Sequence, residues 1–493
     1  MGEIFRYEYK TTAQVTGVWR QAAEIPAGIE NLTLHIEAEE GKELPVGYFF
    51  LGDNLGKIRM QKMTWGKEVS LCVSEKPENT SSGCVPGVME KGRWEFVFYP
   101  SEGEKGRFNI SLREGRSGVT ECIREECWCS GKGEGNLVLD AFDWDREYEK
   151  KPGWYKGDFH THTRLSDGQE TVAGAMENAK ENHLDFYVPT EHNMVHTGWS
   201  ARKSPMILPG MEVTTENGHC NLFGLDRQPG RLPALLEKME GANAEEDMVE
   251  LIREAKAQGW MTSINHPFLH IWKWKHDRLP LELVDFLEIV NDPTYQYAVE
   301  SNDKAIRFLD FLWMNGHRIY GVGGSDSHNK KGQWYPGADG PSIPGDPGTF
   351  VRMDVMTPAS LMKEMKKGHI YISRFCTMEV AIKAGEGEYL PGDEVPVGEK
   401  LICSFRIMGL DRAPHVWLHQ NGKAIIVNTI QKADKTFEGT AELLFAPEEW
   451  NFARLEVRDE KGKFLAWTNP VYGGMKEPEF FTWQDALAEY EKQ

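Results

Sequence analysis

The sequence predicts a multidomain protein in which an α/β core of about seven strands lies between two all-β domains. Apolar and polar residues alternate in steps of two from Phe5 to about Lys151 and again beyond Cys376, a pattern typical of antiparallel strands. Between these segments, short apolar strands alternate with amphipathic helices, which is typical of a parallel sheet or barrel. With 493 residues and 40% hydrophobic content, the chain is long enough to bury several cores.

Changes in this pattern divide the chain into four parts. In the segment before Lys151, Leu32, Leu34 and Ile36 alternate with polar residues. In the segment after Cys376, Leu401 and Cys403 do the same. Both patterns favour β-sandwiches. We therefore predict an N-terminal β-sandwich domain (1–152), an α/β barrel domain (153–375), a C-terminal β-sandwich domain (376–475) and a tail (476–493).

Each helix predicted in the core leads into an apolar strand. The helices are expected at 171–182, 245–258, 303–315 and 358–367, and the first core strand covers about 157–162. About seven such strands can be counted, which favours a closed or nearly closed barrel over an open sheet. Residues 482–493 are expected to form a short surface helix.

Composition restricts the partners and the compartment. A formal charge of -20 and a pI near 5.3 argue against binding to a nucleic-acid backbone, which requires clustered Lys and Arg. No stretch approaches ~20 apolar residues, and residues 1–10 lack the apolar core of a signal peptide, so we expect a cytoplasmic protein without a membrane partner. The eight cysteines are predicted to be reduced structural thiols. The partner expected is a small-molecule substrate, and the oligomeric state is not predicted.

The most informative stretch runs from Gly157 to Gly168. In a strand, the period of two places His160 and His162 on one side. The turn Ser166-Asp167-Gly168 can fold Asp167 back toward this pair. Two imidazoles and a carboxylate form half of a site suited to zinc, manganese or iron.

Similar polar groups follow nearly every predicted core strand. Because the carboxyl ends of barrel strands converge on one mouth, these groups are expected to meet in space. Twelve of the fifteen histidines lie between Trp154 and Arg374. The groups are His160-Thr161-His162, Ser166-Asp167-Gly168, Thr190-Glu191-His192-Asn193, Gly210-Met211-Glu212, Gly218-His219, Asn265-His266-Pro267, Asn291 and Gly324-Ser325-Asp326-Ser327-His328.

Apart from Asn291, these motifs taken together resemble those of the PHP (polymerase and histidinol phosphatase) superfamily. The resemblance covers about Gly157 to Arg374. Within this superfamily, the flanking β-domains and the segment Phe464 to Pro470 resemble the metallohydrolases of the CehA/McbA type. The resemblance implies a distorted (β/α)7 barrel that holds two or three divalent metal ions.

The resemblance also implies the ligands. One ion would be held by His160, His162, Glu212 and Asp326; Glu212 would bridge to a second ion at His219 and His266; and a third would be held by Asp167, His192 and His328. Nine metal-capable residues exceed the needs of one tetrahedral zinc, and a carboxylate is able to bridge two cations. The sequence departs from the family pattern at Glu191, where Asp usually precedes the histidine, and we expect Glu191 to support the ligands rather than bind metal.

Further residues are candidates for binding substrate. They are Arg164, Asn193, Asn291, Trp334 and Arg374. Trp334 lies in the long segment 329–350, which has five glycines and four prolines and is predicted to be a functional loop at the barrel mouth. There, Trp334 or the neighbouring Tyr335 is expected to stack over a bound organic group.

The expected function is that of a metal-dependent hydrolase in which a metal-bridging hydroxide attacks the substrate, with His192, Glu212 and Asp326 as catalytic residues. A phosphoesterase acting on a small molecule is favoured. One alternative is a carbamate or carboxylic ester hydrolase of the CehA type. An alternative of another class is a non-catalytic binding or scaffold protein with a degenerate barrel.

Overall fold

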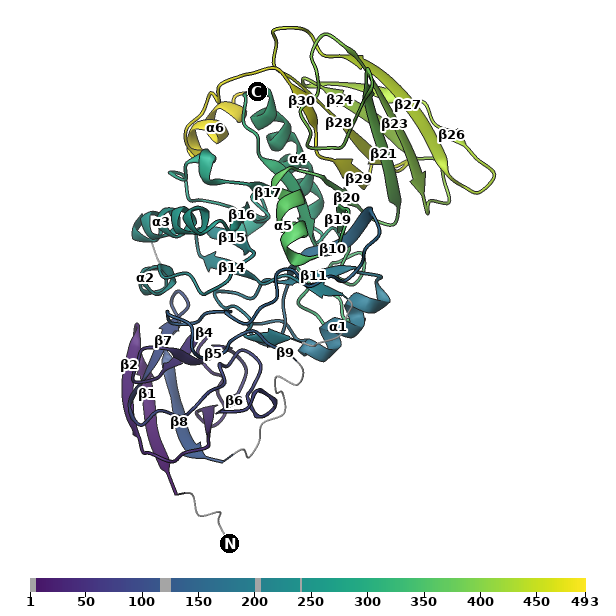
Figure 1. The fold of residues 1–493 in the computed structure, drawn as a ribbon. Coiled ribbons are helices and arrows are strands. Elements are labelled where there is room, and N and C mark those ends of the chain that lie inside the picture. Colours follow the sequence, from purple (N-terminus) through teal and green to yellow (C-terminus); the bar gives the residue numbers. More distant parts are fainter. Residues whose placement is uncertain (1–5, 116–125, 200–204, 240–241) are drawn as a thin grey trace.

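The computed structural model describes residues 6–115, 126–199, 205–239 and 242–493. Figure 1 shows N-terminal strands at one end, a central part with most of the helices, and C-terminal strands at the other end. Within the described residues, no helix is both long and apolar enough to span a bilayer. The seven cysteines in this part of the chain are free thiols, and Cys122 lies outside the described residues.

The N-terminal part consists of two four-stranded antiparallel sheets, with strand orders β1-β8-β3-β6 and β2-β7-β4-β5. Side chains from both sheets, such as Leu34, Phe49, Phe96 and Ile110, meet in one buried cluster. This cluster explains the period of two in the sequence. The strands are β1 (Glu8–Val15), β2 (Trp19–Ile25), β3 (Asn31–Ala38), β4 (Gly47–Gly52), β5 (Ile58–Thr64), β6 (Glu68–Ser74), β7 (Gly92–Pro100) and β8 (Gly106–Glu114), with a short 3-10 helix at Pro77–Asn79.

Strand β4 is buried on both faces. Phe49 and Leu51 point into the cluster between the two N-terminal sheets. Tyr48 and Phe50 belong instead to the large core of the central part, together with Met63 of β5. The run from Tyr48 to Leu51 is therefore apolar throughout rather than alternating. The N-terminal part is packed firmly against the central part.

The central part is built on two sheets. One contains β13-β11-β10-β19-β20, and the other has the order β14-β15-β16-β17-β18. Strands β9 and β12 form a separate two-stranded ribbon. The strands are β9 (Glu126–Cys127), β10 (Gly153–Thr161), β11 (Phe186–Pro189), β12 (Gly198–Trp199), β13 (Met206–Ile207), β14 (Gly210–Thr215), β15 (Gly218–Phe223), β16 (Met261–Ile264), β17 (Phe286–Asn291), β18 (Tyr320–Gly324), β19 (Gly348–Met353) and β20 (Ile370–Ser373).

The helices predicted for the core are present. Thr171 and Thr357 cap the first turns of α1 and α5 by accepting hydrogen bonds from backbone N–H groups. Gly259 and Gly316 follow α3 and α4 with φ of +82° and +83°. The helices are α1 (Val172–Glu181), α2 (Leu232–Glu237), which was not predicted, α3 (Ala242–Gln258), α4 (Ala298–Met314) and α5 (Pro358–Lys366), with short 3-10 helices at His270–Trp272 and Leu281–Leu283.

The predicted closed barrel is not formed, because pairing among the described strands does not join the two central sheets into a ring. One junction has only a single bridge between His192 and Glu212, and the other only a bridge between Thr161 and Ser327. At the second junction Asp326 has a left-handed backbone with φ of +51°, which interrupts a regular ladder. The strand–helix alternation also fails where β14 and β15 form an antiparallel hairpin.

The C-terminal strands form two layers, one of which continues the central sheet. Strand β20 pairs with β29, so that a ten-stranded sheet extends through β28 and β24 to β25. The limit predicted at residue 375 thus separates strands of one sheet, and the domain limits stay a prediction. The second layer has the order β22-β21-β23-β27-β26. The strands are β21 (Thr377–Ala384), β22 (Gly387–Tyr389), β23 (Lys400–Met408), β24 (His415–Gln420), β25 (Lys423–Val427), β26 (Ile430–Gln431), β27 (Phe437–Leu444), β28 (Asn451–Arg458), β29 (Phe464–Thr468) and β30 (Val471–Gly473).

The predicted helix near the end of the chain is α6 (Trp483–Tyr490). A capping box between Thr482 and Asp485 begins it. It is not purely a surface helix, because Trp483 is buried and packs edge-on against Phe308 of α4.

A buried guanidinium ties the C-terminal strands to α4. Arg454 of β28 is 2% exposed and donates to both carboxylate oxygens of Asp310 at 2.6 and 2.5 Å and to Glu456 at 2.8 Å. Burial would raise the pKa of Glu456, but Arg454 and Arg458 hold this pKa down at about 2. Each of these charges depends on the others for compensation.

We predict that Arg454→Met destabilises the fold by roughly 3–5 kcal/mol, because it leaves the carboxylate of Asp310 without its guanidinium partner and removes one of the two guanidinium groups bound to Glu456. The matched control is Arg412→Met, which removes an exposed pair with Glu460 and is expected to cost less than about 1 kcal/mol. The measurement is the urea midpoint of unfolding. Similar losses in the two variants would contradict the buried role of Arg454.

Candidate metal centre

The nine residues predicted as metal ligands lie in one cluster at the strand ends of the central part. Their nitrogen and carboxylate oxygen atoms form four overlapping groups, and within each group the atoms lie within 4.8 Å of one another. The groups are His162, Asp167, His192 and His328; His160, Glu212 and His266; His160, His162 and Asp326; and His192, Glu212 and His219. The structure thus brings together residues that are up to 168 positions apart, from 160 to 328.

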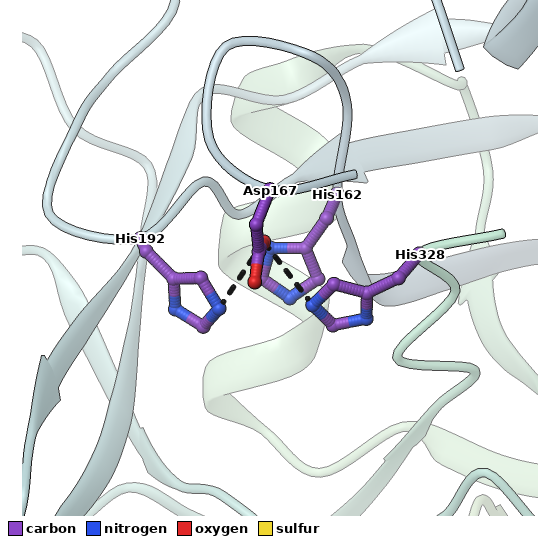
Figure 2. A group of neighbouring side chains, drawn as sticks. All are labelled: His162, Asp167, His192 and His328. Carbon is purple, nitrogen blue, oxygen red and sulfur yellow. Dashed lines mark ion pairs between the residues drawn. The ribbon is translucent and has the colours of Figure 1, made fainter. Parts of the chain in front are cut away.

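A tight turn after β10 brings Asp167 to the cluster. A Cβ atom on Gly168 would lie 2.5 Å from the backbone of His162, so the turn can fold back this closely only with glycine. One oxygen of Asp167, Oδ1, lies 3.5 Å from Nε2 of His192 and 3.3 Å from Nε2 of His328. Figure 2 shows these three side chains around His162.

Glu212 of β14 lies at the centre of the histidines. Its side chain is completely buried, and each of its two oxygens contacts imidazoles. Oε1 lies 3.2 Å from Nε2 of His160, 3.0 Å from Nδ1 of His219 and 3.5 Å from Nε2 of His266. Oε2 lies 2.9 Å from Nδ1 of His192 and 3.5 Å from Nε2 of His162. A carboxylate in this position can bridge two cations.

Asp326, which follows β18, also contacts histidines of the cluster. Its Oδ1 lies 3.3 Å from Nε2 of His160, 3.2 Å from Nε2 of His162 and 3.4 Å from Nδ1 of His328. Asp326 and His266 both have positive φ, +51° and +27°. Left-handed backbone of this kind is concentrated at functional sites, where it turns a side chain in a direction that a regular strand does not allow.

The cluster is electrostatically coupled. Burial would raise the pKa values of Glu212, Asp167 and Asp326, but the surrounding imidazoles hold all three well below the usual range. Burial lowers the pKa of His162 to about 4. At His328 burial acts in the same direction, but the carboxylates of Asp167 and Asp326 raise its pKa to about 9.

Several buried atoms of the cluster have no hydrogen-bond partner of acceptable geometry. They include Nε2 of His160, both ring nitrogens of His162 and Oε2 of Glu212. The short distances to these atoms are ion-pair contacts without hydrogen-bond geometry. A buried polar atom without a partner is costly, and divalent cations would satisfy these imidazole and carboxylate donors together. The residues present therefore fit a metal centre.

Residues that the sequence did not identify as partners orient the predicted ligands. Glu288 accepts hydrogen bonds from Nδ1 of His160 at 2.9 Å and from the backbone N–H of His266 at 2.8 Å. Asn265 donates to Oε1 of Glu212 at 2.8 Å, and Thr214 lies 2.6 Å from Nδ1 of His192. The one available signal for Glu288 was an acidic residue inside the apolar strand β17. Partners of this kind fix the ring orientation of ligand histidines.

Glu191 points away from the cluster, as expected for a supporting residue. It accepts hydrogen bonds from the backbone N–H and the hydroxyl groups of Thr163 and Ser166, and it lies 2.8 Å from Nε2 of His196. Burial would raise the pKa of Glu191, but His196 and its other partners lower it to about 2. Glu191 therefore connects the turn that carries Asp167 with the loop that carries His192.

The predicted substrate-binding residues are distributed differently. Asn291 lines the cavity beside the cluster and donates to Asp326 at 3.3 Å. Asn193 is buried, and its side chain is hydrogen-bonded to the backbone of Thr214. Three others lie away from the cavity wall: Arg164 donates to the backbone of Gln169, Arg374 is paired with Asp346, and Trp334 is 57% exposed.

The cavity beside the cluster has a volume of about 400 Å³. Its lining includes seven of the nine clustered residues together with Asn291 and Asp292, and an aromatic wall of Trp272, Tyr295 and Tyr335 beside Leu269. The ring centroid of Tyr295 lies 6.1 Å from that of Tyr335 and 6.5 Å from that of Trp272, so three loops meet in this aromatic wall. Among the described residues that line the cavity, none is Lys or Arg.

No family model and no curated protein matches this sequence. Among solved structures, the chain is similar to a two-domain protein from Bacteroides vulgatus ATCC 8482 that contains a predicted PHP-like metal-dependent phosphoesterase. The two chains are 16% identical, and the match covers 65% of this chain and 96% of that chain with a TM-score of 0.35. A likeness this distant assigns no function.

We predict that Mn²⁺ or Zn²⁺ raises the melting temperature of the metal-free protein, because the ions bind only the folded cluster. At an ion concentration of 100 times Kd, the free energy of unfolding should increase by about 2.7 kcal/mol. Glu212→Gln should lose most of this shift, since an amide lacks the charge to hold two cations. The matched control is His183→Asn, a change of an exposed histidine outside the cluster whose positive φ Asn tolerates. Equal metal-induced shifts in the two variants would exclude a bridging role for Glu212.

A second prediction concerns pH. Because the pKa of His328 is raised to about 9 in the metal-free protein, this imidazole is protonated at neutral pH, and a cation must displace its proton to bind. Metal affinity should therefore increase as pH rises from 6 toward about 9. Calorimetric titration in buffers of different ionisation enthalpy would measure the released protons. Binding without proton release at pH 7 would contradict this assignment.

Proposed function

We propose that this chain is a metal-dependent hydrolase that holds two or three divalent ions at the nine clustered residues. The observation that carries the proposal is the clustering of all nine, with donor atoms grouped within 4.8 Å, beside a cavity that seven of them line. Imidazole and carboxylate donors suit Zn²⁺, Mn²⁺ or Fe²⁺. The proposed ligands are His160, His162, Asp167, His192, Glu212, His219, His266, Asp326 and His328.

Glu212 is the proposed bridge between ions, because its two oxygens contact different sets of histidines. With Glu212, Asp326 and His192 are the residues proposed to lie closest to the group of the substrate that reacts. The described lining of the cavity contains no Ser or Cys that could act as a nucleophile, which supports water in this role. When bound, the ions would lower the pKa of water and neutralise charge that develops on the substrate.

The protein's own residues keep the donors in place before substrate arrives. Glu288 fixes the ring of His160 through Nδ1, which leaves Nε2 directed at Glu212 and Asp326. Asn265 holds Oε1 of Glu212 in the same way. Preorganised donors of this kind lower the cost of reorganisation during reaction.

A phosphoester of a small organic molecule is the proposed substrate class. Its negative charge would be met by the ions, since no Lys or Arg lines the described part of the cavity and the protein is strongly acidic overall. Its organic group would lie against Trp272, Tyr295 and Tyr335. Nucleic acid is not proposed as a partner because of the charge of -20.

A second candidate is hydrolysis of a carbamate or carboxylic ester. The same lack of Lys and Arg favours it, because a neutral ester needs no fixed cation and gains from the aromatic wall. The third possibility is a non-catalytic scaffold. It is disfavoured because a scaffold has no need for the buried ring nitrogens of His160 and His162 that lack hydrogen-bond partners.

The experiment that tests the proposed function begins with metal analysis of the purified protein. It continues with phosphomonoesters, phosphodiesters, aryl carbamates and carboxylic esters assayed in the presence of Mn²⁺, Zn²⁺ or Fe²⁺. We expect metal-dependent hydrolysis that Glu212→Gln abolishes. Less than about one ion per chain under metal-replete conditions, together with no turnover, would favour the scaffold.

We predict that Tyr335→Ala lowers kcat/KM about tenfold for a substrate with an aromatic group, because a ring in the cavity wall is lost. Trp334→Ala is the matched control: it changes the neighbouring aromatic residue, which is 57% exposed and lies outside the wall. Both variants should retain full metal content. A larger loss of kcat/KM in Trp334→Ala would show instead that Trp334 contacts the substrate, as the sequence predicts.

A further inference from the structure

We propose that the N-terminal part is a brace for the metal centre, which sets the affinity of the ion held by Asp167, His192 and His328. The brace acts on two ligand loops, residues 163–168 with Asp167 and residues 192–197 with His192. The proposal rests on the metal centre proposed above and assigns a role to a part of the chain that contributes no ligand.

The first ligand loop is hydrogen-bonded to the N-terminal part through its backbone. The N–H of Met63 donates to the carbonyl oxygen of Leu165 at 3.2 Å, and the indole Nε1 of Trp65 donates to that of Ser166 at 2.8 Å. Lys62 also donates to Leu165, at 3.3 Å. Within the described chain, these two carbonyl groups, which directly precede Asp167, have no hydrogen-bond donors other than these.

The second ligand loop is held in the same way. The side chain of Gln61, which is fully buried, donates to the carbonyl oxygen of Val195 at 2.6 Å. The hydroxyl of Thr197 donates to the carbonyl oxygen of Cys84 at 2.7 Å. Both bonds lie within five residues of His192.

Apolar packing fixes the loops against the same surface. Leu165 fills the space beside Gly83, where a Cβ would lie 2.3 Å from Cδ1 of the leucine. Tyr48 and Met63 of the N-terminal part share one core with Leu165 and Val195. Because these side chains are close-packed, a shift of either loop would open a cavity.

The two loops are also coupled to each other. Glu191 binds Thr163 and Ser166 of the first loop and His196 of the second. Asp167 and His192 therefore hold their positions only while this assembly stays in place, and an error of about 1 Å in ligand position weakens a metal site. The N-terminal residues supply the outer contacts of this assembly.

The test compares variants that remove one N–H donor each. Trp65→Phe keeps an aromatic ring at a partly exposed position but removes the donor to Ser166, and Gln61→Met removes the donor to Val195. The matched control is Trp94→Phe, which removes an indole donor to the carbonyl oxygen of Glu90 inside the N-terminal part, away from both loops. Equilibrium dialysis against Mn²⁺ with elemental analysis gives the affinity for each ion, and thermal unfolding of the metal-free protein gives stability.

We expect Trp65→Phe and Gln61→Met each to weaken the binding of one ion about fivefold, the effect of one net hydrogen bond, while the other ions bind as in the wild type. Excess Mn²⁺ should restore activity to these two variants. Trp94→Phe should lower thermal stability at unchanged metal affinity. Unchanged affinity in both test variants, or an equal loss in Trp94→Phe, would overturn the brace. A wild-type chain that binds none of Mn²⁺, Zn²⁺ and Fe²⁺ in the same dialysis would overturn the metal centre itself, and the brace with it.

Discussion

The constraint on which the rest of the structure depends is a completely buried carboxylate, Glu212, surrounded by imidazoles. A charge in this position is tolerated only if opposite charge is close to it. In the metal-free chain, protonated histidines supply that charge and hold the pKa of Glu212 low. Divalent ions would supply it more completely, because they would also satisfy the nitrogens that lack hydrogen-bond partners. Much of the surrounding architecture positions side chains around this one group.

This constraint also explains why the central sheets do not close into a regular barrel. Strand ends that meet at the cluster must direct His192, Glu212 and Asp326 inward, and a continuous ladder would direct alternate residues to opposite faces. The two sheets therefore meet through single bridges. Packing supports the central part on both sides: Tyr48 and Phe50 of β4 and Ile58 and Met63 of β5 belong to its core, and β29 extends its sheet into the C-terminal strands.

The aromatic cavity wall and the cluster of nine residues are built by different positions along the same strands and loops. The predicted ligands lie within the strands or within a few residues after them, whereas Trp272, Tyr295 and Tyr335 lie further along the loops after β16, β17 and β18. The chemistry can thus be retained while the wall varies. Such separation of reacting groups from substrate contacts is common where loops are carried on a rigid scaffold.

The sequence by itself determined the core helices and the alternating strands, because these depend on local spacing: a period of two places His160 and His162 on one face, and Gly168 permits the turn that returns Asp167. The full set of nine clustered residues was implied by the resemblance of the motifs to those of a known superfamily. Only the tertiary structure decided that Glu288 and Asn265 orient the ligands, that Tyr335 rather than Trp334 faces the cavity, that Arg164 and Arg374 point elsewhere, and that the sheets do not close. Spacing along a strand predicts the face on which a side chain lies. Spacing does not specify the long-range packing that decides which loops meet and with which partner a charged side chain pairs.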